Sequence, residues 1–270
     1  MSAARVLVLG GFGINCEEET AAAFARAGAQ PRIGSVHDLV AGDLNLGDVR
    51  ILCLPGGFSF GDDLGAGRVL ANTLKFHRAR GGRPFLEELR AFLGGGGFIL
   101  GICNGFQALV QMGLLPNTRG ECEPEATLTR NDSGRFEDRW VTCVVRGRSP
   151  AFPEAGALRL PVRHGEGKLV LADDPVRRAV DEQQLCVLAY ADADGRPTAR
   201  YPENPNGSEL GCAALTDPGR RVLGLMPHPE ANLWHTNDPC WPLERRRDPD
   251  RGDQGEGLAV FRNLVRWVGA

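Results

Sequence analysis

The chain has 270 residues, of which 42% are hydrophobic and 24% are charged, and its formal net charge is −3. This composition is that of a globular protein with a core of its own. The length favours one domain over residues 1–270, with two small domains as the alternative. Lys and Arg (31) nearly balance Asp and Glu (34), which excludes the strongly basic surface that nucleic acids and anionic membranes select.

The first residues lack the pattern of a secretory signal, and no apolar run approaches the roughly 20 residues that span a bilayer. The eight cysteines include no C-x-x-C pair, so neither a zinc site nor a thioredoxin-type motif is indicated. We therefore expect a cytoplasmic protein whose cysteines are mostly reduced and structural, with no nucleic-acid or membrane partner.

The first half of the chain alternates apolar runs with helical segments. Residues 6–9 form a continuous apolar run, and after a Gly-rich turn residues 16–27 predict a helix with Asn15 as its N-cap. Two further apolar runs occupy residues 51–54 and 98–102, and a helix is predicted from about residue 104 to 112. Apolar runs without polar alternation are typical of strands covered on both faces, so we expect a mostly parallel, doubly wound α/β sheet.

The second half has strand candidates without long helices between them, which favours antiparallel or mixed pairing. Residues 238–257 are crowded with Pro, Arg, Asp and Gly, and we interpret them as a surface loop or a partly disordered insert. A final helix is predicted over residues 257–268 from its apolar stripe. The strand candidates are residues 140–145, 158–162, 168–172, 185–189 and 222–226.

A candidate nucleophile, Cys103, stands in the Gly-Ile-Cys-Asn-Gly sequence at 101–105, between a predicted strand and a predicted helix. This is the elbow arrangement in which flanking glycines allow a sharp turn that exposes the nucleophile. The helix N-terminus favours a thiolate, and the N–H of Asn104 points to where an oxyanion would form. The structural alternative is a small buried cysteine between packing glycines.

A candidate base, His228, stands in the Met-Pro-His-Pro-Glu sequence at 226–230, directly after a predicted strand. Two prolines hold this segment extended, so that Glu230 can reach the imidazole and fix its tautomer. Cys103 and His228 both follow apolar strands, and the carboxyl ends of such strands gather at one sheet edge. An exposed turn is the alternative for the His-Pro-Glu sequence alone.

A Gly-rich loop follows the strand at 51–54, with the sequence Pro-Gly-Gly-Phe-Ser-Phe-Gly-Asp at 55–62. Its glycines would let a backbone N–H approach an oxyanion closely. It lacks the G-x-x-x-x-G-K-[ST] pattern of a phosphate loop, and no G-x-G-x-x-G follows the first strand correctly. We therefore expect no bound nucleotide cofactor and no metal.

These motifs together resemble the class I (triad) glutamine amidotransferases, which have a flavodoxin-like fold with, here, a mixed or antiparallel β extension. The resemblance implies a catalytic triad of Cys103, His228 and Glu230, and an oxyanion hole from the backbone of Gly57 and Asn104. It also implies a bound L-glutamine. The substrate-binding residues that it implies are Phe58, Gln107, His164 and Gly165.

Within that family the chain is similar to the glutaminase component of the formylglycinamide ribonucleotide amidotransferases. This resemblance implies that ammonia passes to a synthetase partner, which holds ATP and Mg²⁺ and acts in purine synthesis, with or without a small accessory subunit. It runs from about Arg5 to Glu230 and resumes in the last helix, and Phe60 replaces the usual Tyr. The carrying motifs are residues 13–17, 56–62, 103–105, 164–167, 204–208 and 226–230.

Two other functions stay open on the residues alone. One is a free-standing cysteine amidase or γ-glutamyl hydrolase on the same scaffold, which would need no partner. The other is a binding subunit that keeps the fold without the chemistry, against which the intact Cys-His-Glu set argues. His164 and Glu166 border either the glutamine pocket or the partner surface, or form a tight turn between two strands, and we do not expect them to be catalytic.

Overall fold

A nine-stranded sheet forms the centre of the computed structural model, which describes residues 3–61, 64–78, 82 and 84–269. Five neighbouring strands are parallel to one another, and the other four extend the sheet with antiparallel pairing. The order across the sheet is β2 (Gln30–Ser35), β1 (Arg5–Gly10), β3 (Ile51–Leu54), β4 (Phe98–Ile102), β11 (Val222–Leu225), β10 (Cys212–Thr216), β9 (Cys186–Ala191), β6 (Glu137–Val145) and β7 (Ala157–His164).

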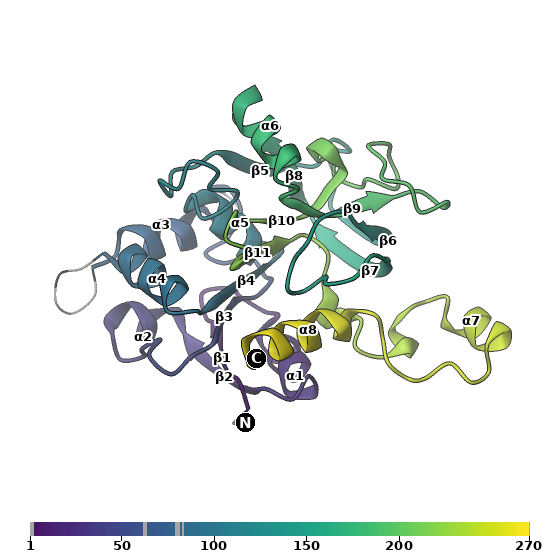
Figure 1. Ribbon diagram of the computed structural model, residues 1–270, viewed down its shortest axis with the longest axis horizontal. Helices are drawn as coiled ribbons and strands as arrows, with labels where there is room; N and C mark the ends of the chain where they lie inside the picture. The colour runs from purple at the N-terminus through teal and green to yellow at the C-terminus, as the bar shows by residue number, and fades with distance from the viewer. Residues whose placement is uncertain (1–2, 62–63, 79–81, 83, 270) are drawn as a thin grey trace.

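Helices cover both faces of the parallel part (Figure 1). The helices α1 (Glu17–Arg26) and α8 (Gly257–Gly269) pack together on one face, and α5 (Asn104–Gln111) lies on the other, against β3, β4 and β11. This arrangement explains why β3 and β4 are buried along their whole length and carry no polar alternation. The remaining helices are α2 (Val36–Ala41), α3 (Arg68–Phe76), α4 (Phe85–Gly94), α6 (Asp174–Glu182) and α7 (Trp241–Arg247).

A second, two-stranded sheet of β5 (Ala126–Arg130) and β8 (Glu166–Leu171) packs against α5. Three short 3₁₀ turns complete the fold: η1 (Glu209–Gly211), η2 (Pro229–Ala231) and η3 (His235–Asn237). The predicted fold class, a mostly parallel doubly wound sheet with a mixed β extension, is confirmed.

Several local predictions were wrong. A helix, α6, does lie between two strands of the second half, and β2, β5 and β10 were not predicted at all. Asn15 does not cap α1, because Cys16 occupies the N-cap position and no side chain caps that end. None of the helices among the described residues is long and apolar enough to cross a membrane.

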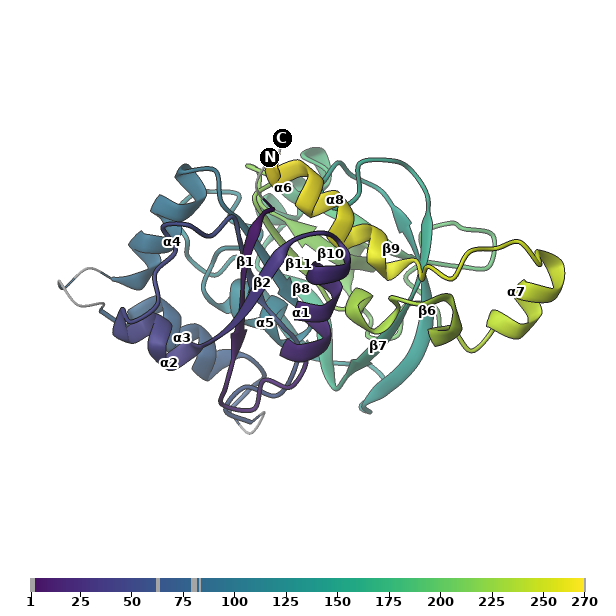
Figure 2. The same ribbon diagram turned by 90° about the horizontal axis from the view of Figure 1, so that it is seen from below.

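The segment 238–257 is not an irregular loop throughout, because it contains α7. Pro242 lies in the first turn of this helix, where a missing N–H costs nothing, and three arginines lie in its last turn. A hydrogen bond of 2.8 Å between His235 Nε2 and Glu244 Oε2 ties α7 back to η3. Figure 2 shows α7 at the end of an arm that extends away from the sheet.

Candidate active site

Cys103 lies at the turn between β4 and α5, as its sequence predicts. Its φ of 50° and ψ of −103° are unusual for a residue with a side chain, as expected at an elbow that projects the thiol out of the turn. The glycines on either side are required by space. A Cβ on Gly101 would lie 2.5 Å from Leu109 Cδ1, and a Cβ on Gly105 would lie 1.8 Å from the carbonyl oxygen of Leu54.

His228 follows β11, the strand next to β4, and so reaches the same edge of the sheet as Cys103. Its Nδ1 lies 2.5 Å from Oε1 of Glu230, and both side chains are buried. The predicted pair is therefore present, but the predicted extended backbone is not. Residues 229–231 form the 3₁₀ turn η2, which brings Glu230 back beneath the imidazole.

The electrostatics of His228 favour a protonated ring. Burial alone lowers the pKa of His228, but the charge of Glu230 and the neighbouring Cys103 outweigh it and hold this pKa well above its ordinary value. The other ring nitrogen, Nε2, is buried and makes no hydrogen bond to the residues that the structure describes. Glu230 thus holds a proton at Nδ1 and leaves Nε2 free to exchange a proton with a thiol, as a base for a thiol requires.

The Gly-rich loop after β3 lies beside the elbow. Gly57 has a φ of +145°, and a Cβ there would lie 2.7 Å from the backbone of Ile14 and Asn15, so only glycine fits. Outside the helices and strands, no backbone hydrogen bond among the described residues uses the N–H of Gly57. Asn104 is the first residue of α5, so its N–H has no acceptor within the helix. Asp62, at the end of the predicted motif, lies outside the described residues.

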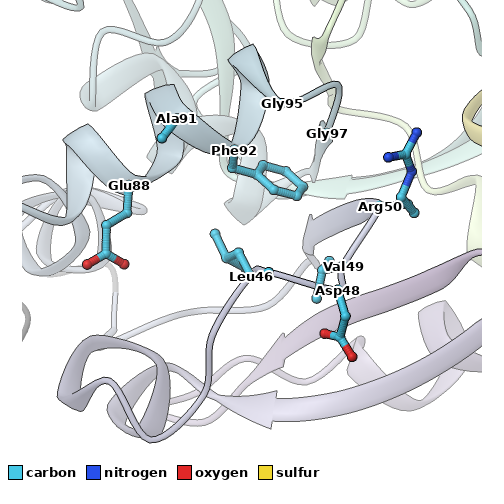
Figure 3. Close-up of a pocket in the computed structure, with 10 residues that line it drawn as sticks. Leu46, Asp48, Val49, Arg50, Glu88, Ala91, Phe92, Gly95 and Gly97 are labelled. Atoms are coloured by element: carbon cyan, nitrogen blue, oxygen red, sulfur yellow. The ribbon is translucent and has the colours of Figure 1, made fainter.

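Cys103 and His228 line one small cavity of about 120 Å³, together with Gly57 and Phe58. The rings of Phe58 and Phe136, which also lines the cavity, lie 6.3 Å apart and are partly exposed. A larger cavity of about 470 Å³ lies where β3 and β4 begin, between residues 46–50 and α4 (Figure 3). It is lined by no cysteine or histidine, so the smaller cavity is the candidate site.

Gln107, His164 and Gly165 are close to the site but do not line this cavity. Gln107 is buried and uses both ends of its amide: Nε2 donates to the carbonyl oxygen of Glu166 at 2.5 Å, and Oε1 accepts from Asn104 at 3.0 Å. It thus fastens the loop that follows β7 to the elbow helix. The predicted contacts of these residues with glutamine remain predictions.

His164 is held as a neutral ring. Its Nδ1 lies 3.2 Å from Oδ1 of Asn131, which also accepts from the N–H of Gly167 and so leaves Nδ1 as the protonated nitrogen. Burial, and then the charge of His228, lower the pKa of His164 to about 3. His164 therefore contributes no charge to the site at neutral pH.

Four residues that line the cavity were not predicted as site residues: Asn15, Cys16, Phe136 and Arg163. Cys16, at the start of α1, lines the cavity, and its sulfur lies within 4.8 Å of ligand atoms of His228 and Glu230. Burial raises the pKa of this thiol, although the neighbouring imidazole of His228 opposes the rise. Arg163, on β7, also lines the cavity, and its carbonyl oxygen lies 3.7 Å from the sulfur of Cys103. The signals in the sequence were the motif at residues 13–17, which contains Cys16, and the predicted His164, which follows Arg163.

These three atoms of Cys16, His228 and Glu230 could in principle hold a metal ion. Nδ1 of His228 is already bonded to Glu230, however, and this arrangement matches an oriented base beside a thiol more closely. The chemistry that this site supports is nucleophilic attack by Cys103, with proton transfer by His228 and an oxyanion held by backbone N–H groups.

Residues 3–268 match the family model of the CobB/CobQ-like glutamine amidotransferase domain. The chain is 39% identical over 270 residues to the phosphoribosylformylglycinamidine synthase subunit PurQ of Dehalococcoides mccartyi, covering 99% of each protein. It is 37% identical over 269 residues to the phosphoribosylformylglycinamidine synthase of Drosophila melanogaster, covering 97% of this chain and 19% of that protein. The solved structure of PurLQS from Thermotoga maritima is similar with a TM-score of 0.70 and 28% identity, covering 98% of this chain and 99% of that one.

Proposed function

The chain belongs to the CobB/CobQ-like glutamine amidotransferase domain family, and we propose that Cys103, His228 and Glu230 carry out its glutaminase reaction. The chain functions as the glutaminase subunit of phosphoribosylformylglycinamidine synthase in purine biosynthesis. The single observation that supports the proposed triad is the buried 2.5 Å bond between Nδ1 of His228 and Glu230, made next to a cysteine in an elbow turn.

The reaction begins with attack of the Cys103 thiolate on the side-chain amide carbon of glutamine. Because the pKa of His228 is raised, its ring is protonated at neutral pH and can give a proton to the departing ammonia. The N–H groups of Gly57 and Asn104 stabilise the tetrahedral oxyanion, and loss of one such donor typically slows a reaction by ~10²–10³-fold. His228, now neutral, then activates the water that releases glutamate from the thioester.

Ammonia is used by a synthetase partner, which converts formylglycinamide ribonucleotide to the amidine with ATP. The proportions of the Drosophila relative agree with this division, because this chain matches only 19% of that protein and most of its length remains for other steps. We propose that ATP and Mg²⁺ bind to the partner and not to this chain, whose Gly-rich loops lack a phosphate-loop lysine. A small accessory subunit is part of the same proposal.

We also propose that residues 1–270 act as one domain in the cytoplasm. The family model covers residues 3–268, and one sheet connects both halves of the chain, which supports a single domain. All eight cysteines are free, including seven that are buried, and free thiols are typical of a reducing compartment.

The test separates ammonia production from ammonia use. Cys103→Ala, reconstituted with the synthetase, should lose the glutamine-dependent reaction and retain the ammonium-dependent one. Cys240→Ala is the matched control, because Cys240 is a partly exposed cysteine outside the cavity. Equal glutamine-dependent rates in Cys103→Ala and wild type would refute the proposed nucleophile.

The same assay without the partner distinguishes a subunit from a free-standing hydrolase. We expect slow glutamine hydrolysis by the isolated chain and strong stimulation when the synthetase is added. High activity of the isolated chain, unchanged by the partner, would favour the free amidase.

A further inference from the structure

Two nitrogens of the Arg163 guanidinium group are buried without a partner, although the residue as a whole is half-buried. Its Nε and Nη2 atoms are shielded from solvent and make no hydrogen bond, and Arg163 takes part in none of the ion pairs of the described residues. Leaving a cation in such surroundings without compensation is costly, because the lost hydration is not replaced. A group that arrives with the substrate would remove this cost.

Arg163 is placed where such a group would arrive. It lines the same cavity as Cys103 and His228, and its carbonyl oxygen faces the Cys103 sulfur at 3.7 Å. No Asp or Glu is among the described residues that line this cavity, and Arg163 is the one residue among them whose side chain is permanently charged. The cavity therefore combines a nucleophile with a cation that lacks a counter-charge.

Glutamine offers a matching pair of groups. When its amide carbon lies at the Cys103 sulfur, its α-carboxylate lies at the other end of a short flexible chain. A guanidinium fork binds a carboxylate through two parallel N–H···O bonds, a geometry that lysine cannot reproduce. We propose that Arg163 binds the α-carboxylate of the glutamine substrate and so selects glutamine over amides that lack this group. The proposal rests on the glutaminase function proposed above.

A second arginine on the same strand provides the contrast. Arg159 is four residues earlier on β7 and so projects from the same face of the strand. It differs in having a counter-ion, because its Nε lies 2.8 Å from Asp238 Oδ2. It does not line the cavity. Arg159→Met removes the same charge from the same strand without touching the substrate pocket, which makes it a matched control.

The experiment compares two substrates in the complex with the synthetase partner. One is glutamine, and the other is 4-aminobutyramide, which is glutamine without its α-carboxylate. Arg163→Met should raise KM for glutamine about 10- to 100-fold, the range expected when charge-assisted hydrogen bonds are lost, with little change in kcat. Its kcat/KM for 4-aminobutyramide should stay at the wild-type value. Arg163→Lys should give a smaller rise, since it keeps the charge and loses the fork.

Two results would overturn the proposal. Wild-type kinetics on glutamine in Arg163→Met would show that no carboxylate contact exists, and an equal loss on both substrates would show a purely structural role. If Arg163→Met does not fold, Arg163→Lys decides by the same two-substrate comparison. A wild-type complex without any glutaminase activity would contradict the proposed function itself. An active wild type together with unchanged glutamine kinetics in Arg163→Met would contradict only this inference.

Discussion

The two sides of the candidate site are held in place by different means. The nucleophile side, residues 56–58 and 101–105, depends on backbone shape, with a strained Cys103 between glycines that admit no Cβ. The polar side, which lies between β7, β8 and η1, depends on buried side chains. Its members are Asn131, His164, Asn206 and Ser208, with Tyr190 behind them.

Bonds among these buried groups fix the loop after β7. Asn131 Nδ2 donates to the carbonyl oxygen of His164 at 2.8 Å, Ser208 Oγ accepts from the N–H of Leu169 at 3.0 Å, and Asn206 Nδ2 donates to Tyr190 at 3.0 Å. A side built from backbone should respond to added volume, and a side built from polar groups should respond to protons and lost partners. The comparison thus teaches which kind of change each side cannot tolerate.

The largest effect should come at Glu230, where one side-chain bond controls the chemistry. Glu230→Gln removes the charge that holds the pKa of His228 up and no longer fixes its tautomer, so glutamine hydrolysis should slow by about 10³- to 10⁴-fold. The measurement is kcat in the complex with the partner. Glu230→Asp, which keeps the charge at shorter reach, should be less impaired. If kcat of Glu230→Gln were within tenfold of the wild-type value, Glu230 would not be a member of the triad.

On the nucleophile side, Gly105→Ala should destabilise the fold instead of changing a pKa. The added Cβ would lie 1.8 Å from the Leu54 carbonyl oxygen, and both partners are backbone, so neither can rotate away. We expect a loss of about 3 kcal/mol or more in the free energy of unfolding, measured by urea titration. Gly94→Ala is the control, because Gly94 is also helical, has no left-handed φ and has open space around its Cβ position. Equal stability of Gly105→Ala and wild type would contradict the packing argument.

The difference between the two sides also explains what the sequence could predict. Cys103 was identified because the elbow needs glycines at fixed spacing between a buried strand and a helix, and both requirements are visible in the residues themselves. His228 and Glu230 were identified from their position after an apolar strand, although η2 and not an extended chain joins them. Local backbone rules were therefore sufficient to predict most of the nucleophile side.

Two of the three missed strands, β2 and β10, lack strong local signals. β2 has only one buried residue in the sequence Gln-Pro-Arg-Ile-Gly-Ser, because it is an edge strand, and β10 is a short run whose neighbours are set by antiparallel pairing. Arg163 was not selected because an unpartnered guanidinium is a property of the folded surroundings. The polar side therefore became visible only when the fold brought β7, β8 and η1 together.

The polar side should be sensitive to acid through His164. Because the pKa of His164 is about 3 in the folded protein, against 6.5 ordinarily, the unfolded chain takes up a proton between these values that the folded chain does not. The free energy of unfolding is therefore independent of His164 above pH 6.5 and decreases as the pH falls towards 3, by about 5 kcal/mol at most. His164→Asn keeps a donor for Asn131 and cannot titrate, so its stability should fall less between pH 6.5 and 4.

Urea unfolding at several pH values measures this effect, and the slope with pH matters more than the absolute stability. The Asn variant is expected to be less stable than wild type at pH 8, because a smaller side chain leaves space in a buried site. His37→Asn makes the same replacement at an exposed histidine and serves as the control. Parallel slopes in His164→Asn and wild type would show that His164 does not resist protonation.

The smallest effect should come at Cys16, the second thiol that lines the cavity. Cys16 lies between the parts of the site, because it is the N-cap of α1 beside the Gly-rich loop and its sulfur lies near His228. Burial raises the pKa of Cys16, so it stays a neutral thiol at pH 7, and a thiol is a poor nucleophile. Cys16→Ala should therefore keep glutamine hydrolysis within about fivefold of wild type, a change of no more than about 1 kcal/mol in the barrier.

Labelling makes the choice between the two thiols direct. A chloroketone analogue of glutamine should modify Cys103 in the wild type and in Cys16→Ala alike, as located by mass spectrometry of the digested protein. Both thiols lie at a helix N-terminus beside the imidazolium, but only Cys103 has the strained turn. If the label were found on Cys16, or if folded Cys16→Ala lost activity as completely as Cys103→Ala, proximity to His228 would outweigh the elbow. Backbone shape would then not be what selects the nucleophile.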